Sequence, residues 1–362
     1  MFLAGDVMTG RGIDQVLPHP GDPELFEKAV TSAEDYVWLA ERRSGPIPRP
    51  VSYAHVWGDL GDEIARRHCD LRLINLETAI TRAGMPEPKG INYRMHPDNI
   101  EVLNCVGIDG CILANNHAMD WGRAALIDTL DTLKAAGVGT VGAGRTAVEA
   151  ASPLIHDCPG RGRVIVVAFG AETAGVPRSW AAGDSLPGVE LLPQNPEVTV
   201  ARVRDRITPL RRPDDVLVVS IHWGGNWGYE VSDDQRTLAY ALIDRAGADV
   251  IFGHSSHHPK CVELHSGKLI LYGAGDLIND YEGIEGFERY RGDLALAYFV
   301  DVSTCDGRLA TLEMVPYQRR GFRLQRIGGE TAAWLAEAIG HCGLSPGPRT
   351  TLIKDDVLQI VP

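Results

Sequence analysis

A short apolar run ends in polar side chains at residues 107–120, which read Gly-Ile-Asp-Gly-Cys-Ile-Leu-Ala-Asn-Asn-His-Ala-Met-Asp. Residues 107–113 predict a buried strand. Two amides, an imidazole and a carboxylate follow it, at Asn115, Asn116, His117 and Asp120. Because amide oxygens and imidazoles bind metals and imidazoles also transfer protons, one interpretation is a functional site. The alternative is that the amides only cap the helix predicted at residues 124–136.

Four other buried runs end in the same way. They finish at a carboxylate or an imidazole, in the order Asp6, Glu77, His222 and His254. In layered α/β folds, the carboxyl ends of the strands form the edge where ligands bind. Two carboxylates, an amide oxygen and at least two imidazoles, without cysteine, suit Mn²⁺, Zn²⁺ or Fe²⁺. Alone, Asp6 is equally typical of a turn and His222 of a core histidine. Together the five endings predict a metal site.

The remaining pattern predicts the fold class. Early alternation of strands and helices, followed by antiparallel-looking strands, indicates a layered α/β sandwich. We expect one domain over residues 1–362, a surface insertion or lid at 18–55, and trailing strands and a helix at 294–362 that complete the sandwich. Strands are predicted at 2–8, 71–77, 107–113, 138–142, 163–170, 215–222, 248–253, 268–273, 294–302, 308–315, 322–327 and 357–361. Helices are predicted at 24–39, 56–68, 97–106, 124–136, 198–208, 233–246 and 330–340.

Composition narrows the class of partner. The chain has 362 residues and a net charge of -13, which argues against general binding to nucleic acid or to anionic membranes. No apolar run approaches the ~18 residues of a membrane span, and no signal-like segment precedes the first strand. We therefore expect a cytoplasmic protein without a membrane anchor and a small partner. The seven scattered cysteines are expected to be reduced.

Five blocks of sequence carry a family resemblance, at residues 5–8, 75–78, 114–120, 221–224 and 253–257. In this order they resemble the signature blocks of the CapA/PgsA (PGA_cap) family of capsule or poly-γ-glutamate biosynthesis proteins, over roughly residues 2–280. That family is similar to calcineurin-like metallophosphoesterases. The resemblance implies a four-layer α/β/β/α sandwich with a centre of one or two divalent metal ions.

The resemblance also implies residue roles. Glu77 would bridge two metals, and His117 would protonate the leaving group, oriented by Asp120. The remaining ligands would be Asp6 and His257 for the first metal and Asn116, His222 and His254 for the second.

This sequence departs from the metallophosphoesterase pattern in three places. The first block, Asp6-Val7-Met8, has no histidine; the bridging residue is the longer Glu77; and two serines separate His254 from His257. The first metal site therefore has fewer protein ligands, so a mononuclear centre is an alternative. His258 is an alternative to His257 as ligand.

An anionic substrate needs positive charge in an acidic protein. Arg11, Lys89 and Arg94 are the candidate anchors, because Arg presents a planar fork to phosphate or carboxylate. Arg94 would also stabilise charge during the reaction, and Trp223 would line the substrate pocket. The alternative for each cation is a solvated side chain, and for Trp223 a packed loop. Asp276 is a candidate to orient a ligand imidazole.

Two functions follow. The first is a metal-dependent hydrolase or transferase that uses metal-bound hydroxide on a phosphorylated or γ-glutamyl substrate, in synthesis, transfer or hydrolysis of a poly-γ-glutamate type. The second is a non-catalytic accessory protein that binds a polyanion or a partner subunit of such a synthetic complex.

Overall fold

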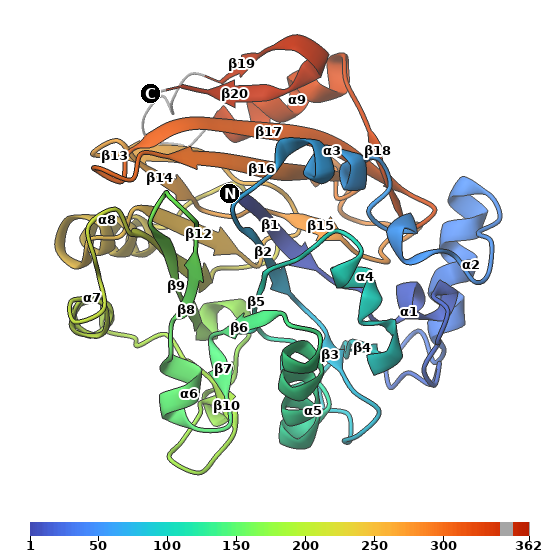
Figure 1. Ribbon diagram of the computed structural model, residues 1–362. Coiled ribbons are helices and arrows are strands. Elements are labelled where there is room, and N and C mark those ends of the chain that lie inside the picture. Colours follow the sequence, from blue (N-terminus) through green and yellow to red (C-terminus); the bar gives the residue numbers. More distant parts are fainter. Residues whose placement is uncertain (341–349, 362) are drawn as a thin grey trace.

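The larger of two main sheets has ten strands in the computed structural model, which describes residues 1–340 and 350–361 (Figure 1). Strands β1, β2, β5 and β6 are parallel, and β16 joins β1 antiparallel. The path runs β19-β20-β17-β16-β1-β2-β5-β6, with β15 paired to β1 and β18 to β17. The strands are β1 Phe2–Val7, β2 Arg72–Leu76, β5 Gly110–Ile112, β6 Gly139–Val141, β15 Asp276–Ile278, β16 Leu294–Val302, β17 Leu309–Arg320, β18 Arg323–Arg326, β19 Thr351–Leu352 and β20 Leu358–Ile360.

The second sheet has six strands in the order β13-β14-β12-β11-β9-β8. Strands β9, β11, β12 and β14 are parallel, and the pairing of β11 with β12 places His222 opposite His254. The strands are β8 Leu154–Asp157, β9 Arg163–Gly170, β11 Val216–His222, β12 Val250–His254, β13 Val262–His265 and β14 Lys268–Leu271. Two short pairs complete the strands: β3 (Ala79–Ile80) with β4 (Arg94–Met95), and β7 (Ala143–Gly144) with β10 (Gly188–Val189).

Helices lie around these sheets (Figure 1). Helix α8 shows how the sequence sets their ends: Ser232 and Gln235 form a capping box, and Gly247 ends the helix at a φ of 75°. The α-helices are α1 Gly12–Val16, α2 Ala33–Ser44, α3 Asp59–Arg67, α4 Glu101–Asn104, α5 Gly122–Ala135, α6 Ala147–Ala151, α7 Pro196–Ile207, α8 Asp233–Ala246 and α9 Glu330–Gly340. Short 3-10 helices are η1 Tyr53–His55, η2 Pro97–Asn99, η3 Glu172–Ala174, η4 Arg178–Trp180, η5 Glu288–Tyr290 and η6 Lys354–Asp356.

The two main sheets share a hydrophobic core. Leu3 and Leu73 of the ten-stranded sheet belong to one buried cluster with Val218 and Phe252 of the six-stranded sheet. Burying apolar side chains between the sheets removes them from water, which is the main favourable term in folding. The mixed α/β class is confirmed, and its layering as a four-layer sandwich stays a prediction.

Most predicted elements are present, and one helix is displaced. The helix predicted at 24–39 is wrong in its position, because α2 begins only at Ala33. Before it, the chain turns back on itself, with Leu25 donating to the Thr31 carbonyl at 2.9 Å and Ala33 to the Pro23 carbonyl at 2.7 Å. Ser32 then caps the helix by accepting from the Glu34 amide.

The cysteines also differ from expectation. Cys261 is disulfide-bonded, so the prediction that all seven are reduced is wrong for this residue. Cys342 lies outside the described residues. The free thiols are Cys69, Cys105, Cys111, Cys158 and Cys305. Within residues 1–340 and 350–361, every helix is too short or too polar to cross a bilayer.

Arg11 ties the 18–55 segment to the rest of the molecule. Its Nη2 and Nε lie 2.5 and 2.9 Å from the two oxygens of Asp280, and its Nη1 lies 2.9 Å from Glu27 Oε1. The guanidinium also lies 3.7 Å from the ring centre of Tyr36 in α2. Both charges of the Arg11–Asp280 pair are fully buried, so each depends on the other for compensation. Whether the segment acts as a lid, and the proposed domain division, stay predictions.

We expect Asp280→Ala to lower the free energy of unfolding by about 3–5 kcal/mol, because it leaves the buried Arg11 charge with one carboxylate fewer. Urea unfolding measures this change. The control is Asp131→Ala, which removes an exposed partner of Arg145 and should cost about 1 kcal/mol or less. Equal losses in both variants would contradict a structural role for the buried pair.

Candidate metal centre

Three buried side chains meet where the two main sheets face each other. Asp6 lies near the carboxyl end of β1, and His222 and His254 are the last residues of β11 and β12. One ligand atom from each lies within 4.8 Å of the other two. Asp6, His222 and His254 are each at most 1% exposed. The structure thus brings together residues separated by up to 248 positions in the sequence.

The hydrogen bonds of the two histidines leave both Nδ1 atoms facing one point. His222 Nε2 lies 2.9 Å from Asn116 Oδ1, and because an amide oxygen only accepts, Nε2 carries the ring proton. The lone pair of His222 Nδ1 therefore points at His254 Nδ1, 2.7 Å away. Ser220 Oγ lies 2.7 Å from His254 Nε2 and can accept its proton. The Nδ1 lone pairs of His222 and His254 then point at each other, and a shared proton or a cation between them would remove their repulsion.

Carboxylates add negative charge at the same place. Asn75 Nδ2 donates to Asp6 Oδ1 at 2.7 Å and to Glu77 Oε2 at 3.1 Å, and Asn115 holds the Asn75 oxygen at 3.0 Å. Burial and the charge of Asp276 raise the pKa of Asp6 to about 7. Burial and the charge of Asp6 raise the pKa of Glu77 well above its ordinary value. Crowded buried carboxylates are stabilised as anions by a bound cation, so this donor set fits a divalent metal.

Glu77 lies between two histidines. Its Oε1 is 3.7 Å from His117 Nε2 and 3.8 Å from His222 Nε2. His117 Nδ1 lies 2.6 Å from Asp120 Oδ2, and because a carboxylate accepts, Nδ1 carries the proton. Burial lowers the pKa of His117 to about 4, so at pH 7 the ring is neutral and Nε2 presents a lone pair toward Glu77.

Asp120 is itself held firmly. Lys89 Nζ donates to Asp120 Oδ1 at 2.6 Å, and the Tyr93 amide donates to Oδ2 at 2.6 Å. Lys89 also donates to the Asn116 carbonyl at 2.5 Å. The predicted anchor Lys89 is therefore in the site, where it positions the Asp120–His117 pair.

His257 lies beside the three-residue group and is held by other side chains. Its Nδ1 is 3.0 Å from Asp276 Oδ1, and its Nε2 accepts from Asn226 Nδ2 at 2.9 Å. Burial lowers the pKa of His257, but the charge of Asp276 outweighs it and the net shift is upward. His258 faces elsewhere, with Nδ1 3.1 Å from the Pro259 carbonyl. A ligand role for His257 stays a prediction.

Three expected substrate contacts have other partners in the structure. Arg11 is committed to Asp280 and Glu27, as described above. The Arg94 guanidinium lies 3.7 Å from the ring centre of Trp121 and donates to the Asp22 carbonyl, and Trp223 is buried with Nε1 donating to the Tyr272 carbonyl at 3.0 Å. None of these contacts is with a member of the metal-binding group, and substrate binding by Arg11, Arg94 and Trp223 stays a prediction.

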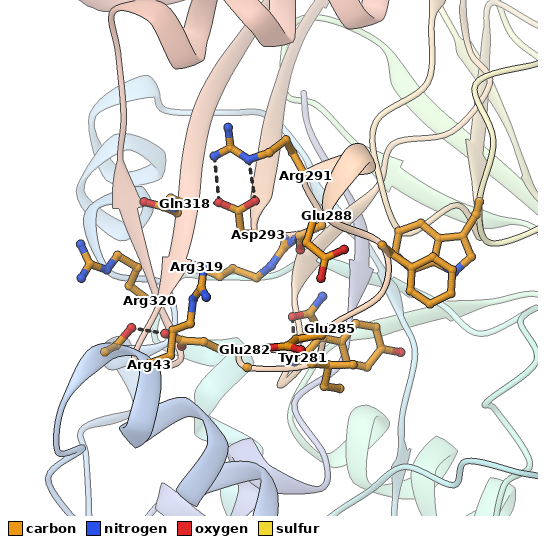
Figure 2. A pocket seen from close by; sticks show the side chains of 17 residues that line it. Arg43, Tyr281, Glu282, Glu285, Glu288, Arg291, Asp293, Gln318, Arg319 and Arg320 are labelled. Atoms are coloured by element: carbon orange, nitrogen blue, oxygen red, sulfur yellow. Dashed lines mark hydrogen bonds and ion pairs between the residues drawn. The ribbon is translucent and has the colours of Figure 1, made fainter.

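A cavity of about 650 Å³ lies near the His257 side (Figure 2). Tyr281 lines it. The Tyr281 ring contacts the His257 ring edge-on, with 5.2 Å between centroids, and the Tyr281 hydroxyl accepts a hydrogen bond from the Tyr93 hydroxyl at 2.6 Å. The labelled arginines are accompanied by as many acids, and Arg291 pairs with Asp293. The charged lining consists of Arg43, Arg291, Arg319, Arg320, Glu282, Glu285, Glu288 and Asp293. The cavity therefore has no excess of positive charge for a polyanion.

Sequence reasoning missed the polar residues behind the ligands. Asn75 and Ser220 precede Glu77 and His222 by two positions, and alternate residues of a strand face the same side. That spacing was the available signal. Asn226, which holds His257, lies in a loop whose path the sequence pattern does not indicate.

Comparison with known proteins gives consistent matches. The family described as "Bacterial capsule synthesis protein PGA_cap" matches residues 1–281. A Mycobacterium tuberculosis protein named "Probable polyglutamine synthesis accessory protein" is 42% identical over 100% of this chain and 96% of its own length. The "PGA biosynthesis protein CapA" of Bacillus subtilis is 27% identical over 82% of this chain and 66% of its own. The "Capsule biosynthesis protein CapA" of Bacillus anthracis is 25% identical over 87% and 66%.

We expect the protein to bind Mn²⁺ or Zn²⁺ and to lose that binding in His222→Ala and in His254→Ala, because each change removes an Nδ1 donor. Ser220→Ala should weaken binding about 10- to 100-fold, since it removes the partner that orients His254. Titration calorimetry on chelator-treated protein measures the affinity.

His265→Ala serves as the control, because His265 pairs with Asp244 at the surface. Unchanged metal affinity in His222→Ala and His254→Ala would show that the three-residue group is not a metal site.

Proposed function

The chain belongs to the bacterial capsule synthesis protein family, and we propose that it is a metal-dependent enzyme acting on an anionic phosphorylated or γ-glutamyl substrate. The names of the Bacillus relatives refer to capsule and PGA biosynthesis. Poly-γ-glutamate-type synthesis, transfer or hydrolysis is therefore the class of reaction we assign to this chain.

The observation that carries the proposal is one juxtaposition. A three-residue group suited to a divalent cation lies next to Glu77, and Glu77 lies 3.7 Å from an imidazole whose other nitrogen is held by a buried carboxylate. A purely structural metal site needs no such additional imidazole beside its ligands. A cation donor set beside an oriented proton-transfer group is typical of metal-assisted acyl or phosphoryl chemistry.

Asp6, His222 and His254 would hold the metal, with Asn116 and Glu77 beside them. When bound, a divalent cation there would polarise a substrate oxygen and lower the pKa of water. Asn75 keeps Asp6 and Glu77 in place, and Ser220 orients His254. These contacts are made inside the protein, so the donors are preorganised before substrate arrives.

His117 would transfer the proton. Asp120 fixes the tautomer with hydrogen on Nδ1, so Nε2 would take a proton from the attacking water and then deliver it to the leaving group. Lys89 and the Tyr93 amide hold Asp120 in the geometry that this requires. The edge-on contact of Tyr93 with the His117 ring, at 4.6 Å between centroids, restricts the ring further.

An accessory role is the second candidate function. The Mycobacterium tuberculosis relative carries the word accessory in its name, and it matches the whole of this chain. In this role the protein would bind a polyanion or a partner subunit without turnover. The two candidates differ in what His117 does, because a binding protein has no need of an oriented proton-transfer group.

We expect His117→Ala to lower kcat by about 10²- to 10⁴-fold, the usual contribution of general acid–base catalysis, with bound metal unchanged. Turnover of a generic phosphodiester and of a γ-glutamyl peptide, measured together with metal content, tests this. His19→Ala, a change at an exposed position, is the control.

A metal-loaded protein that turns over neither substrate, and whose binding of a γ-glutamyl polymer is the same in His117→Ala, would favour the accessory role. Activity that survives His117→Ala at the wild-type level would remove His117 from the mechanism.

A further inference from the structure

The side chain of Asn226 faces one ring nitrogen of His257. The other nitrogen, His257 Nδ1, lies 3.0 Å from Asp276 Oδ1, so Nε2 is the nitrogen that can bind a ligand. The amide nitrogen of Asn226 lies 2.9 Å from this Nε2. Asn226 is exposed, whereas His257 is buried among the residues of the candidate metal centre. Solvent therefore reaches the pair from the Asn226 side.

Backbone and side-chain hydrogen bonds hold Asn226 in this place. The His257 amide donates to the Asn226 carbonyl at 2.9 Å, and Ser255 Oγ donates to the Gly224 carbonyl at 3.2 Å. The Ser255 amide also donates to Asp6 Oδ2 at 3.3 Å. The loop after β11 is therefore held against the segment that follows β12, and this segment lies beside the candidate metal centre.

A second amide–imidazole pair in the site has the same spacing. His222 Nε2 lies 2.9 Å from Asn116 Oδ1, and both residues are predicted metal ligands. Two ligand atoms that bind one ion at about 2.1 Å and at right angles lie about 3 Å apart. Rotation of the Asn226 amide by half a turn exchanges Nδ2 for Oδ1, which presents a neutral oxygen at the same position. The Asn226–His257 pair therefore has the spacing of two ligands of one ion.

The first block of the sequence leaves a ligand position to be filled. The metallophosphoesterase pattern has a histidine where this chain has Met8, and Met8 is fully buried. A thioether is a soft ligand, whereas amide and carboxylate oxygens suit Mn²⁺. Asp6 and His257 are then the ligands implied for that metal, so a further oxygen near His257 would supply what Met8 lacks.

We propose that Asn226 and His257 are ligands of a divalent ion at His257, in addition to the ion held by Asp6, His222 and His254. The proposal rests on the metal centre of the proposed function and makes that centre dinuclear. The alternative is that the Asn226 amide only occupies His257 Nε2 and keeps it from a metal. Removal of the amide weakens binding of the ion at His257 in the first case and strengthens it in the second.

The test is calorimetric titration of the chelator-treated protein with Mn²⁺, together with metal analysis. We expect two binding events per chain in the wild-type protein, and His257→Ala should abolish one of them. Asn226→Leu removes the amide oxygen at similar size, so it should weaken the same event at least about tenfold and leave the other unchanged. Asn226→Asp should retain it, since a carboxylate oxygen takes the place of the amide oxygen.

Gly225→Ala is the matched control, because an added Cβ at this neighbouring position meets open space. If Asn226→Leu proves unfolded by circular dichroism, Asn226→Ala replaces it. Unchanged binding at His257 without the amide would overturn the proposal, and tighter binding would show that the amide blocks the histidine instead.

One bound Mn²⁺ per chain in the wild-type protein would also overturn the proposal. None of these readouts uses turnover, so the two proposals fail separately. An inactive protein that holds two ions would contradict the proposed function alone, and an active protein that holds one ion would contradict the second ion alone.

Discussion

The packing of the ten-stranded sheet against the six-stranded sheet positions the candidate metal centre. Strand β1 of the ten-stranded sheet ends near Asp6, and strands β11 and β12 of the six-stranded sheet end at His222 and His254. Apolar side chains from both sheets form one buried cluster behind these ends. Because hydrophobic packing brings the sheets together, polar groups that no single sheet would place side by side become neighbours.

That packing creates an electrostatic requirement. Asp6, Glu77 and Asp276 are almost fully buried; besides burial, the charge of Asp276 raises the pKa of Asp6, and the charges of Asp6 and Asp276 raise the pKa of Glu77. Asn75 supplies two N–H donors to this group, which lessens the cost without cancelling the charge. A divalent cation would cancel it. The high pKa of Asp6 and the converging Nδ1 atoms of the two histidines both fit a site that requires a positive charge.

The structure also separates positive charges that the sequence suggested as substrate anchors. Arg11 stabilises the fold through Asp280, and Arg94 rests on Trp121. Only Lys89 lies in the site, and it holds Asp120.

Elements with a strong apolar pattern, and the polar residues at the strand ends, can be predicted from the amino-acid sequence. The strand at residues 163–170 and the helix at 233–246 agree with prediction to the residue, because their apolar periodicity and caps act locally. Helix α2 was misplaced, since the turn before Ser32 depends on backbone hydrogen bonds rather than on pattern.

Which polar residues face one another depends on how the sheets pack. The tertiary structure brought Asp6 to the two histidines, assigned Arg11 to Asp280 and placed Asn75 between two carboxylates. The reason is physical: periodicity records which side of an element is buried, whereas contacts between elements depend on how separate sheets pack in space.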